Sequence, residues 1–562
     1  MTHAITRRTA LAGTATAGAA ALLVGCAKKN NEETKNIADS STDIKELYDI
    51  NEQPVSALKQ GGTLVLSITA LGPDFNTWSA SGNSSYTSTV MSPMRNASFW
   101  QTLPDGSEVL NKAYCESFEQ KIEGSKEILT YKLNKQAVFN DGTPVDIDAM
   151  RTTWEVKRDE EGPWKIEGSE LYGKIESIEA IDGDNFHVKV VCKEPAYPVQ
   201  NLFSEIMHPS MRDPELFNNG YVNNPHPEYC SGPFKLESLN TGEKVMTLVP
   251  NEKWWGDKPV LDKIIFRQME PQAARAALKN GEIDAVATGT AAGYNELKDT
   301  AGTVVRRGQY LFAGGLNINP KRVEDQKVRK AIFVGTDREN LGKIRFQGLP
   351  YKEKVSGSMV MMPFNKNYRY NFPVETKDVS QAQKILEGAG YTKNGDYYAK
   401  DGKNVKVSIT IFGDTAVNNS MAQAFVQNMK EIGIECGIDQ QPNSAFSKVV
   451  GNKDYDITFS GYSVSSDPTI GTKQFYYRKE NDGVGTAEID AMIEKMLTEP
   501  DDVKRAQLCN DIEKKHMDEV CTLGTSFNGP DYVIVKEKLA NYGSFLYARN
   551  AQIPWVKIGW MK

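Results

Sequence analysis

Four side chains near the middle of the chain have the chemistry of metal ligands. His226, Glu228 and Cys230 lie in one short segment, and His208 precedes them. Imidazole, carboxylate and thiolate groups are the usual ligands of zinc. Their spacing matches no metal-binding motif, however, and Pro227 stiffens the loop between them. We therefore expect neither a metal site nor a cofactor.

The remaining ionisable residues form no catalytic pattern. Asp and Glu are spread along the chain without the paired carboxylates of a glycosidase motif. Gly-x-Ser-x-Gly, His-Glu-x-x-His and a phosphate-binding Gly-rich loop are missing from the sequence. An exported hydrolase is supported only by general α/β character, so we predict that the protein is not an enzyme. An activity screen on the intact protein would test this.

The first residues predict export and a lipid anchor. Arg7 and Arg8 precede an apolar run at residues 10–24, which is the order of an export signal. The run is shorter than the roughly 20 residues of a transmembrane helix. Residues 23–26 resemble the bacterial lipobox, in which the cysteine, here Cys26, is diacylated. An ordinary signal peptide is the alternative, and either the Sec or the twin-arginine route is open. We expect the protein on the outer face of the cytoplasmic membrane.

Length, charge and cysteine content narrow the class of protein. The 562 residues are 40% hydrophobic, which is enough for two or more cores. The net charge of −7, without a sustained basic block, argues against a nucleic-acid partner. Disulfides are plausible in an exported chain, with the pairing left open, among Cys115, Cys192, Cys230, Cys436, Cys509 and Cys521.

Hydrophobic periodicity predicts strands that alternate with helices, which is typical of α/β lobes. Residues 27–60 are polar and predict a flexible tether. Strands are predicted at residues 63–68, 131–133, 315–319, 406–412, 455–459 and 532–535. Helices are predicted at residues 147–156, 380–389, 419–432, 489–497 and 503–520.

Residues 230–286 give the most detailed local prediction. Strands around Phe234 and residues 245–249 alternate apolar and polar side chains, and Thr241-Gly242 supplies the turn, where glycine tolerates positive φ. Pro271 suits the first turn of a helix, and Gly281 suits its left-handed end.

Four linked motifs in this stretch are similar to those of one family. Residues 232–234, 251–256, 259–264 and 281–284 read Gly-Pro-Phe, Asn-Glu-Lys-Trp-Trp-Gly, Pro-Val-Leu-Asp-Lys-Ile and Gly-Glu-Ile-Asp. They resemble the extracytoplasmic solute-binding proteins of peptide and nickel ABC importers. Further landmarks stand at residues 138–146 and 325–341.

The resemblance implies a fold and a division of the chain. The fold is the α/β, two-lobed periplasmic-binding-protein-like fold (type II, with three subdomains), and the protein is expected to be a monomer. The implied parts are a signal peptide at 1–26, a tether at 27–60, a first lobe from 61–100, 225–310 and 523–562, an inserted subdomain at 101–224 and a second lobe at 311–522. Trp254 and Trp255 are expected in the core of the first lobe.

The resemblance also implies where a ligand binds, because this family closes its two lobes on the solute. Aromatic faces and amides should converge from both lobes. The candidates are Asn76, Trp78 and Trp100 in the first lobe, and Asn317, Asn319, Tyr462 and Asp467 in the second.

One departure from the family pattern concerns the type of ligand. Peptide binders carry an acidic residue, which pairs with the α-amino group of the ligand, at positions that correspond here to Ser465 and Ser466. A buried ammonium without a counter-charge costs several kcal/mol. Asp467 follows, but in the family that position mainly shapes a turn. The sequence therefore does not favour tight binding of a free peptide N-terminus.

The predicted function is capture of oligopeptides, or of another bulky polar solute, for an ABC permease and its ATPase. An alternative rests on residues 75–78, 90–94 and 98–100, which look like the actinobacterial branch of the family. That branch includes mycobacterial lipoproteins linked to lipoglycan assembly, and such a protein would bind an envelope glycolipid or a glycosyltransferase without transport. Permease and ATPase genes beside this gene would favour transport.

Overall fold

The computed structural model describes residues 42–95, 98–159, 161–166 and 170–562. The chain divides into two compact units, each built from distant parts of the sequence. Among the described residues, unit 1 comprises 42–43, 310–496 and 501–530, and unit 2 comprises 44–309, 497–500 and 531–562. The predicted signal peptide and Cys26 lie outside the described residues. Within the described ranges, no helix has both the length and the apolar character needed to cross a membrane.

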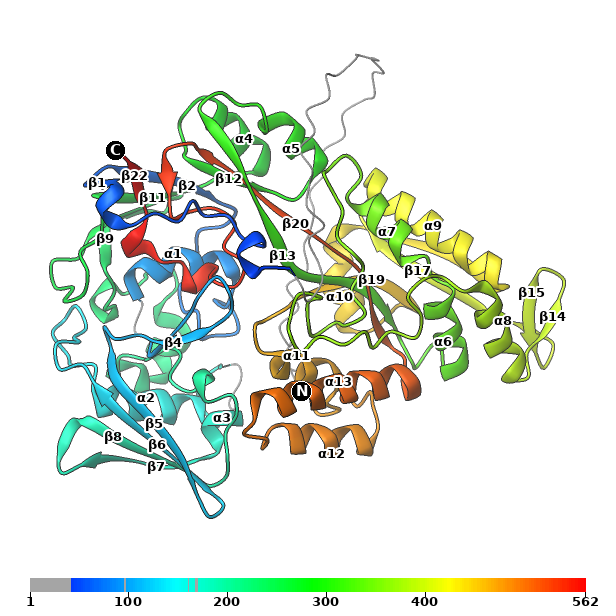
Figure 1. Cartoon of the computed structure of the whole chain (residues 1–562), viewed down its shortest axis with the longest axis horizontal. Helices are drawn as coiled ribbons and strands as arrows, with labels where there is room; N and C mark the ends of the chain where they lie inside the picture. The colour runs from blue at the N-terminus through cyan, green and yellow to red at the C-terminus, as the bar shows by residue number, and fades with distance from the viewer. Residues whose placement is uncertain (1–41, 96–97, 160, 167–169) are drawn as a thin grey trace. The chain divides into compact units, whose positions relative to one another are not determined.

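Unit 2 contains a sheet with the strand order β12-β2-β11-β10-β9 (Figure 1). β2 is parallel to β11 and β12, while β9, β10 and β11 form an antiparallel meander. Leu64 and Leu66 of β2 point into one apolar core, and Val65 between them packs against helices α4 and α5 on the opposite face. The bounds are β2 Thr63–Ile68, β9 Phe234–Asn240, β10 Val245–Pro250, β11 Lys263–Gln268, β12 Ala285–Thr288, α4 Pro271–Lys279 and α5 Ala291–Leu297.

Most local predictions for residues 230–286 are confirmed. Both strands of the hairpin form, Pro271 is the first residue of α4, and Gly281 has a φ of 77° just beyond the helix. The prediction for the hairpin turn was wrong in one respect. The positive φ of 56° belongs to Lys244 and not to Gly242, because the turn extends over four residues.

A second, antiparallel sheet with the order β5-β6-β8-β7 has its own core within unit 2. Helix α2 covers it and begins where predicted, since Asp146 Oδ1 accepts a hydrogen bond of 2.9 Å from the Asp148 N–H. Trp254 and Trp255 pack against this second core rather than the core of the main sheet, and Trp255 Nε1 donates to the Ala113 carbonyl at 2.7 Å. The bounds are β3 Trp100–Thr102, β4 Glu108–Leu110, β5 Cys115–Glu123, β6 Lys126–Leu133, β7 Ile175–Ile181, β8 Asp184–Cys192, α2 Ile147–Lys157 and α3 Glu170–Gly173.

The described start of the chain packs against its end. β1 (Leu58–Lys59) pairs with β22 (Gly559–Met561), which also pairs with β21 (Leu539–Ala540). Leu47 is fully buried, and Ile50 packs with Phe545. Packed structure therefore begins at about residue 44, earlier than the predicted end of the tether at residue 60. Helix α1 (Ser85–Arg95) contributes Val90, Met91 and Met94 to the main core.

Unit 1 contains strands in the order β18-β17-β19-β13-β20. β13 and β20 are much longer than predicted, and each has residues in both units. Parallel pairing joins β18, β17 and β19, whereas β19 is antiparallel to β13. The bounds are β13 Thr303–Ile318, β17 Lys406–Phe412, β18 Glu435–Gln441, β19 Ile457–Ser463 and β20 Leu523–Lys536.

Helices cover this sheet and form the main core of unit 1 with it. Within the landmark at residues 325–341, helices start at Gln326 and Arg338, with Asp325 and Asp337 as N-caps. The bounds are α6 Gln326–Val334, α7 Arg338–Arg345, α8 Val379–Gly388, α9 Ala416–Ile432, α10 Phe446–Gly451, α11 Pro468–Tyr476, α12 Ala487–Met496 and α13 Asp502–Glu519, with a small hairpin sheet of β14 Thr392–Asn394, β15 Tyr397–Lys400 and β16 Lys403–Asn404.

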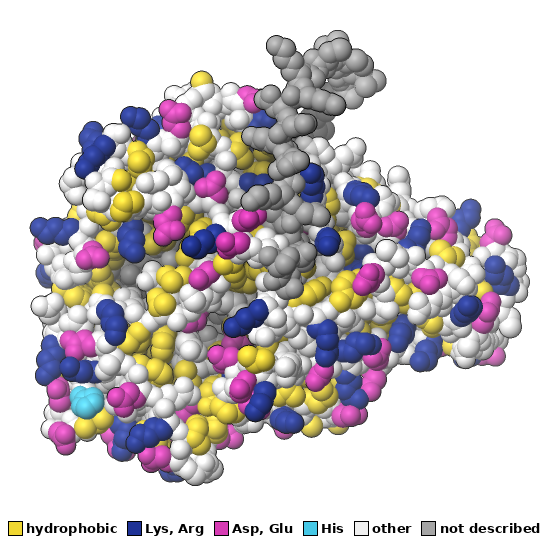
Figure 2. Space-filling view, viewed as in Figure 1, with side chains coloured by type: hydrophobic (Ala, Val, Ile, Leu, Met, Phe, Trp, Pro, Cys, Tyr) yellow, Lys and Arg dark blue, Asp and Glu magenta, His cyan; other side chains and the backbone are white. Residues whose placement is uncertain are grey.

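The six cysteines in the described residues are all free thiols, so the expected disulfides do not form. Five of them are buried and behave as small hydrophobic side chains. Burial raises the pKa of four of these thiols to about 12, namely those of Cys115, Cys192, Cys509 and Cys521. Acidic and basic side chains are interspersed over the face of each unit seen in Figure 2, in keeping with the small net charge.

Candidate functional site

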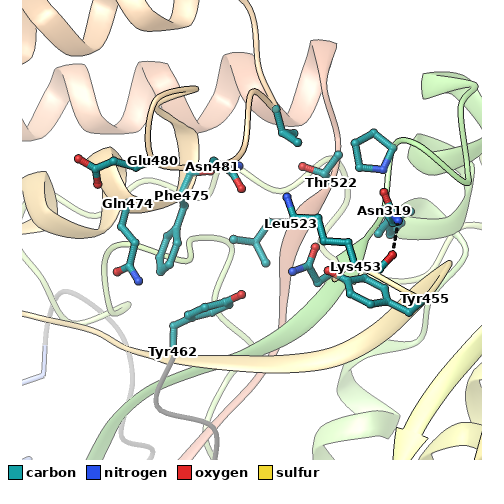
Figure 3. Close-up of a pocket in the computed structure, with 14 residues that line it drawn as sticks. Asn319, Lys453, Tyr455, Tyr462, Gln474, Phe475, Glu480, Asn481, Thr522 and Leu523 are labelled. Atoms are coloured by element: carbon teal, nitrogen blue, oxygen red, sulfur yellow. Dashed lines mark hydrogen bonds between the residues drawn. The ribbon is translucent and has the colours of Figure 1, made fainter. Parts of the chain in front are cut away.

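A hollow in unit 1 lies beside β13 and β19 and is bordered by α11 and the start of β20 (Figure 3). Its empty volume, open mouth included, is about 560 Å³. Three predicted ligand-binding residues line it, namely Asn317, Asn319 and Tyr462. Residues not predicted from the sequence also line it, among them Lys453, Gln474, Phe475, Glu480, Asn481 and Thr522.

The pairing of β13 with β19 places Asn317 and Tyr462 on one face of the sheet. Asn317 lies opposite Thr458, and Tyr462 lies opposite Ala313. Because side chains alternate along a strand, positions 313, 315 and 317 share a face with 458, 460 and 462. The Asn317 amide and the Tyr462 hydroxyl make no hydrogen bond to the rest of the described chain. Both groups are therefore open to a ligand.

Asn319 is positioned differently, although it follows Asn317 on the same face. Its side chain is 3% exposed, and both ends of its amide are bonded within unit 1. Nδ2 donates to the Lys453 carbonyl at 2.8 Å, and Oδ1 accepts from the Lys321 N–H at 3.0 Å. In this structure Asn319 holds the loop before Tyr455 against the strand, and each end of its amide already has a partner in the protein.

Asp467 acts through the helix that it starts. Its Oδ1 accepts from the Thr469 N–H at 2.7 Å, which caps the first turn of α11. Two turns later α11 presents Gln474 and Phe475 to the hollow. The Phe475 ring lies 4.6 Å from the Tyr462 ring, and the two aromatic rings form one wall, as Figure 3 shows. Asp467 thus positions the wall from a distance.

The charges in the hollow are already neutralised within unit 1. Lys453 and Glu480 are the charged residues among those that line it. Lys453 Nζ pairs with Asp482 at 2.9 Å, and Glu480 pairs with Lys473 at 2.6 Å. What remains is an aromatic wall with neutral amide and hydroxyl groups. Such a site favours an uncharged polar part of a ligand.

A buried polar cluster supports the hollow from behind. His516 of α13 is fully buried, and its Nε2 lies 3.0 Å from the Thr522 hydroxyl. Burial, with Arg329 nearby, lowers the pKa of His516 to about 3, so its imidazole is neutral. Glu513 is also buried, and burial raises the pKa of its carboxyl. That carboxyl accepts bonds from the Met359 N–H at 2.7 Å and from the Tyr476 hydroxyl at 2.9 Å.

The three candidates from the other lobe lie in unit 2. Asn76 is fully buried; its Nδ2 donates to the Phe217 carbonyl at 2.6 Å, and its Oδ1 accepts from the Trp78 N–H at 3.1 Å. Asp74 ties the same loop by accepting from the Asn76 N–H at 2.8 Å. Trp78 is 9% exposed and packs in the main core of unit 2.

Trp100 lies in the core of the second sheet of unit 2, separate from Trp78. Its side chain is 8% exposed, and its ring meets the Phe118 ring edge-on at 5.0 Å. In this structure, therefore, Asn76, Trp78 and Trp100 are engaged in structural contacts. Their roles in ligand binding stay predictions.

Comparison with known proteins decides the family. The model of the bacterial extracellular solute-binding proteins, family 5, matches residues 111–483. The chain belongs to this family. Family 5 proteins are extracytoplasmic binding proteins that work with ABC permeases, so the protein is a solute-binding protein and not an enzyme.

Named relatives agree with this assignment. The oligopeptide-binding protein OppA of Mycobacterium tuberculosis is 27% identical over 555 residues, which cover 97% of this chain and 92% of that protein. A periplasmic EDTA-binding protein, EppA, has a similar fold, with a TM-score of 0.80 and 22% identity over 93% of this chain and 99% of its own. Lactococcal OppA, solved with an endogenous peptide, has a TM-score of 0.70 and 20% identity. The protein therefore has the predicted two-lobed α/β fold.

A sequence signal existed for some of the residues that were not predicted. Asp467-Pro468 is a helix start, and a helix begun there places Gln474 and Phe475 two turns on. Lys453, Glu480 and Thr522 come from loops and from a strand start, and no periodic pattern marks them.

Proposed function

We propose that this family 5 protein captures oligopeptides, or another bulky polar solute, and delivers it to the permease of an ABC importer. The observation that carries the proposal is the relationship to an oligopeptide-binding protein over 97% of the chain. The hollow in unit 1 supports it, because the aromatic wall and the Asn317 amide suit apolar side chains and neutral polar groups of one ligand.

The proposal includes a location. Cys26 carries acyl chains that hold the protein at the outer face of the membrane, where two or three chains on one residue suffice for a stable anchor. Metabolic labelling with a palmitate analogue tests this, with Cys26→Ala as the unlabelled variant. Equal labelling of both proteins would refute the anchor.

The charge balance of the hollow refines the expected ligand. Since Lys453 and Glu480 are already paired, a free ammonium or carboxylate of the ligand gains no counter-charge from them. The part of the ligand bound in unit 1 is therefore neutral, as in the interior of a peptide.

Mass spectrometry of the material that copurifies with the native protein, followed by isothermal titration, tests the function. Peptides should be recovered, and synthetic copies should bind. Tyr462→Ala should weaken binding by about tenfold or more, since it removes the aromatic wall. The control is Asn185→Ala, an exposed residue near the start of β8 in unit 2, and it should bind as the wild type does. A copurifying glycolipid, with no heat released by any peptide, would instead favour the envelope role.

A further inference from the structure

Three aromatic residues fix the orientation of the strands of unit 1 next to the hollow. Phe527 of β20 packs in a hydrophobic cluster with Leu341 and Met421, and Phe312 of β13 and Phe459 of β19 pack against the same cluster. These three phenylalanines therefore lie on one face of adjacent strands. Because successive side chains point to opposite faces, their strand neighbours share the other face.

That other face carries polar residues. Ser526 and Asn528 flank Phe527, and Ser460 follows Phe459. Asn317 and Tyr462, which line the hollow, belong to the same face by the same alternation. The polar face thus extends from the hollow across β13 to β20.

The polar atoms at the β20 end of this face lack partners. Asn528 and Ser526 are fully buried, yet both amide atoms of Asn528 and the hydroxyl of Ser526 form no hydrogen bond within the described chain. The buried Ser460 hydroxyl is also unpaired in the described chain. Buried polar groups normally have partners, so an amide with both of its groups unpaired needs an explanation.

Other polar side chains on the same strands are satisfied by the protein. The Thr525 hydroxyl donates to the Gly314 carbonyl at 3.3 Å, and the Thr458 hydroxyl donates to the Thr410 carbonyl at 3.0 Å. Within the described residues of β19 and β20, the buried side-chain polar atoms that lack a partner belong to Ser460, Ser526 and Asn528.

Strand β13, which lies between β19 and β20, carries only small residues on this face next to the three unpaired side chains. Ala313 and Gly315 are its residues on this side, and Gly315 lies opposite Ser460. A Cβ at Gly315 would lie 2.4 Å from the Gly524 carbonyl oxygen, so a larger residue cannot stand there. The Met359 sulfur lies 3.4 Å from the same point, and an unbranched methionine side chain can move aside.

We propose that Asn528, with Ser526 and Ser460, binds the main chain of one extended residue of the ligand. The Asn528 Nδ2 donates to the C=O of that residue, and its Oδ1 accepts from the N–H of the same residue, because these two groups point the same way in an extended chain. The serine hydroxyls serve the adjoining groups. The proposal rests on the proposed function, and it adds the residues of unit 1 that hydrogen-bond the main chain of the ligand.

A pair of uncharged probes tests this assignment. One is a short alanine peptide blocked at both ends, and the other is its analogue with one amide replaced by an ester, scanned along the chain. The wild-type protein should bind the peptide, and the ester at one position should weaken binding by about tenfold, the effect of one lost hydrogen bond. Asn528→Leu should bind the peptide at least tenfold more weakly and should no longer distinguish the ester at that position.

Stability measurements separate binding from folding. If the Asn528 amide is bonded only when a ligand is present, Asn528→Leu leaves the thermal midpoint of the ligand-free protein unchanged or raises it, because two unpaired buried groups are removed. Ser526→Ala, which removes only a hydroxyl, provides a second variant with the same expected loss of affinity. Thr525→Val is the control, since its hydroxyl is bonded within the protein, and it should lower stability while still distinguishing peptide from ester.

Two outcomes would overturn the inference, and they differ from failure of the function. If both substituted proteins bind the blocked peptide as tightly as the wild type, the assignment of Asn528 and Ser526 is wrong, while peptide binding stands. If Asn528→Leu lowers the thermal midpoint without changing affinity, the amide has a structural role, such as holding a water. Failure of the wild type to bind any blocked peptide would overturn the proposed function and this inference together.

Discussion

Replacing His516 should remove a defined part of the acid sensitivity of unit 1. The imidazole is fully buried between the Tyr476 ring, with centroids 4.6 Å apart, and the Thr522 hydroxyl. Its folded-state pKa is about 3, whereas an unfolded chain has the ordinary value of 6.5. Between these two pH values the unfolded chain binds the proton and the folded chain does not. The stability contributed by the neutral histidine is therefore present above pH 6.5 and is lost as the pH falls toward 3.

The magnitude follows from linkage. From pH 7.5 to pH 5 this one group should reduce the free energy of unfolding by about 2 kcal/mol, and the full loss approaches about 5 kcal/mol near pH 3. His516→Gln keeps a polar side chain but cannot titrate. The substituted protein is expected to be less stable at pH 7.5, because ring packing is lost, and the difference from the wild type should shrink by about 2 kcal/mol at pH 5.

Urea unfolding at a series of pH values, followed by circular dichroism, measures this difference. Glu513 also titrates in the same cluster, with its pKa raised by burial, but it is present in both proteins and its contribution cancels to first order. His187→Gln is the control, since this partly exposed histidine lies in β8 of unit 2. Parallel stability curves for the wild type and His516→Gln between pH 7.5 and 5 would refute the argument.

Two further predictions concern packing and the thiols. Gly461→Ala should destabilise unit 1 by roughly 1–3 kcal/mol, because its Cβ would lie 1.8 Å from the Phe312 ring. The control is Gly437→Ala in β18, which has open space around it and should change stability by less than about 1 kcal/mol. Equal effects of the two substitutions in thermal unfolding would contradict this prediction. Cys115, Cys192, Cys509 and Cys521, each with a pKa of about 12, should resist a thiol reagent at pH 8 in the native protein and react within minutes in urea, as mapped by mass spectrometry. Rapid labelling of these four thiols in the native protein would contradict their burial.

Local sequence signals predicted elements that local physics controls. β2, β17 and the starts of α2 and α4 were predicted closely, because hydrophobic periodicity and Pro at a first turn act within a few residues. The long strands β13 and β20 were predicted only in part. Glycines at 314 and 315, and Gly529-Pro530, interrupt the apolar alternation there, and neighbouring strands rather than propensity hold these segments extended.

Within the candidate site, local sequence likewise did not predict which side chains are open to a ligand. Asn317 lies on β13 and Asn319 directly follows the strand, yet only the Asn319 amide is bonded at both ends, to Lys453 and Lys321. The Asn76 amide is likewise bonded at both ends, to the Phe217 carbonyl and to the Trp78 N–H of its own loop. Two of these bonds, from Asn76 to the Phe217 carbonyl and from Asn319 to the Lys453 carbonyl, join residues more than 100 positions apart. Composition and spacing do not show which amides have such partners.

The pairing of β1 with β22 has a consequence for synthesis of the chain. Strand β12 pairs with residues 532–535 of β20, and β1 receives its partner only at residues 560–561. Unit 2 therefore cannot complete its sheets until residues 560–561 have been made. A product truncated by even thirty residues lacks β21 and β22 and leaves Leu58 without its strand partner. Residues 559–561 thus hold two otherwise separate strands, because their removal would leave both β1 and β21 with an unpaired edge.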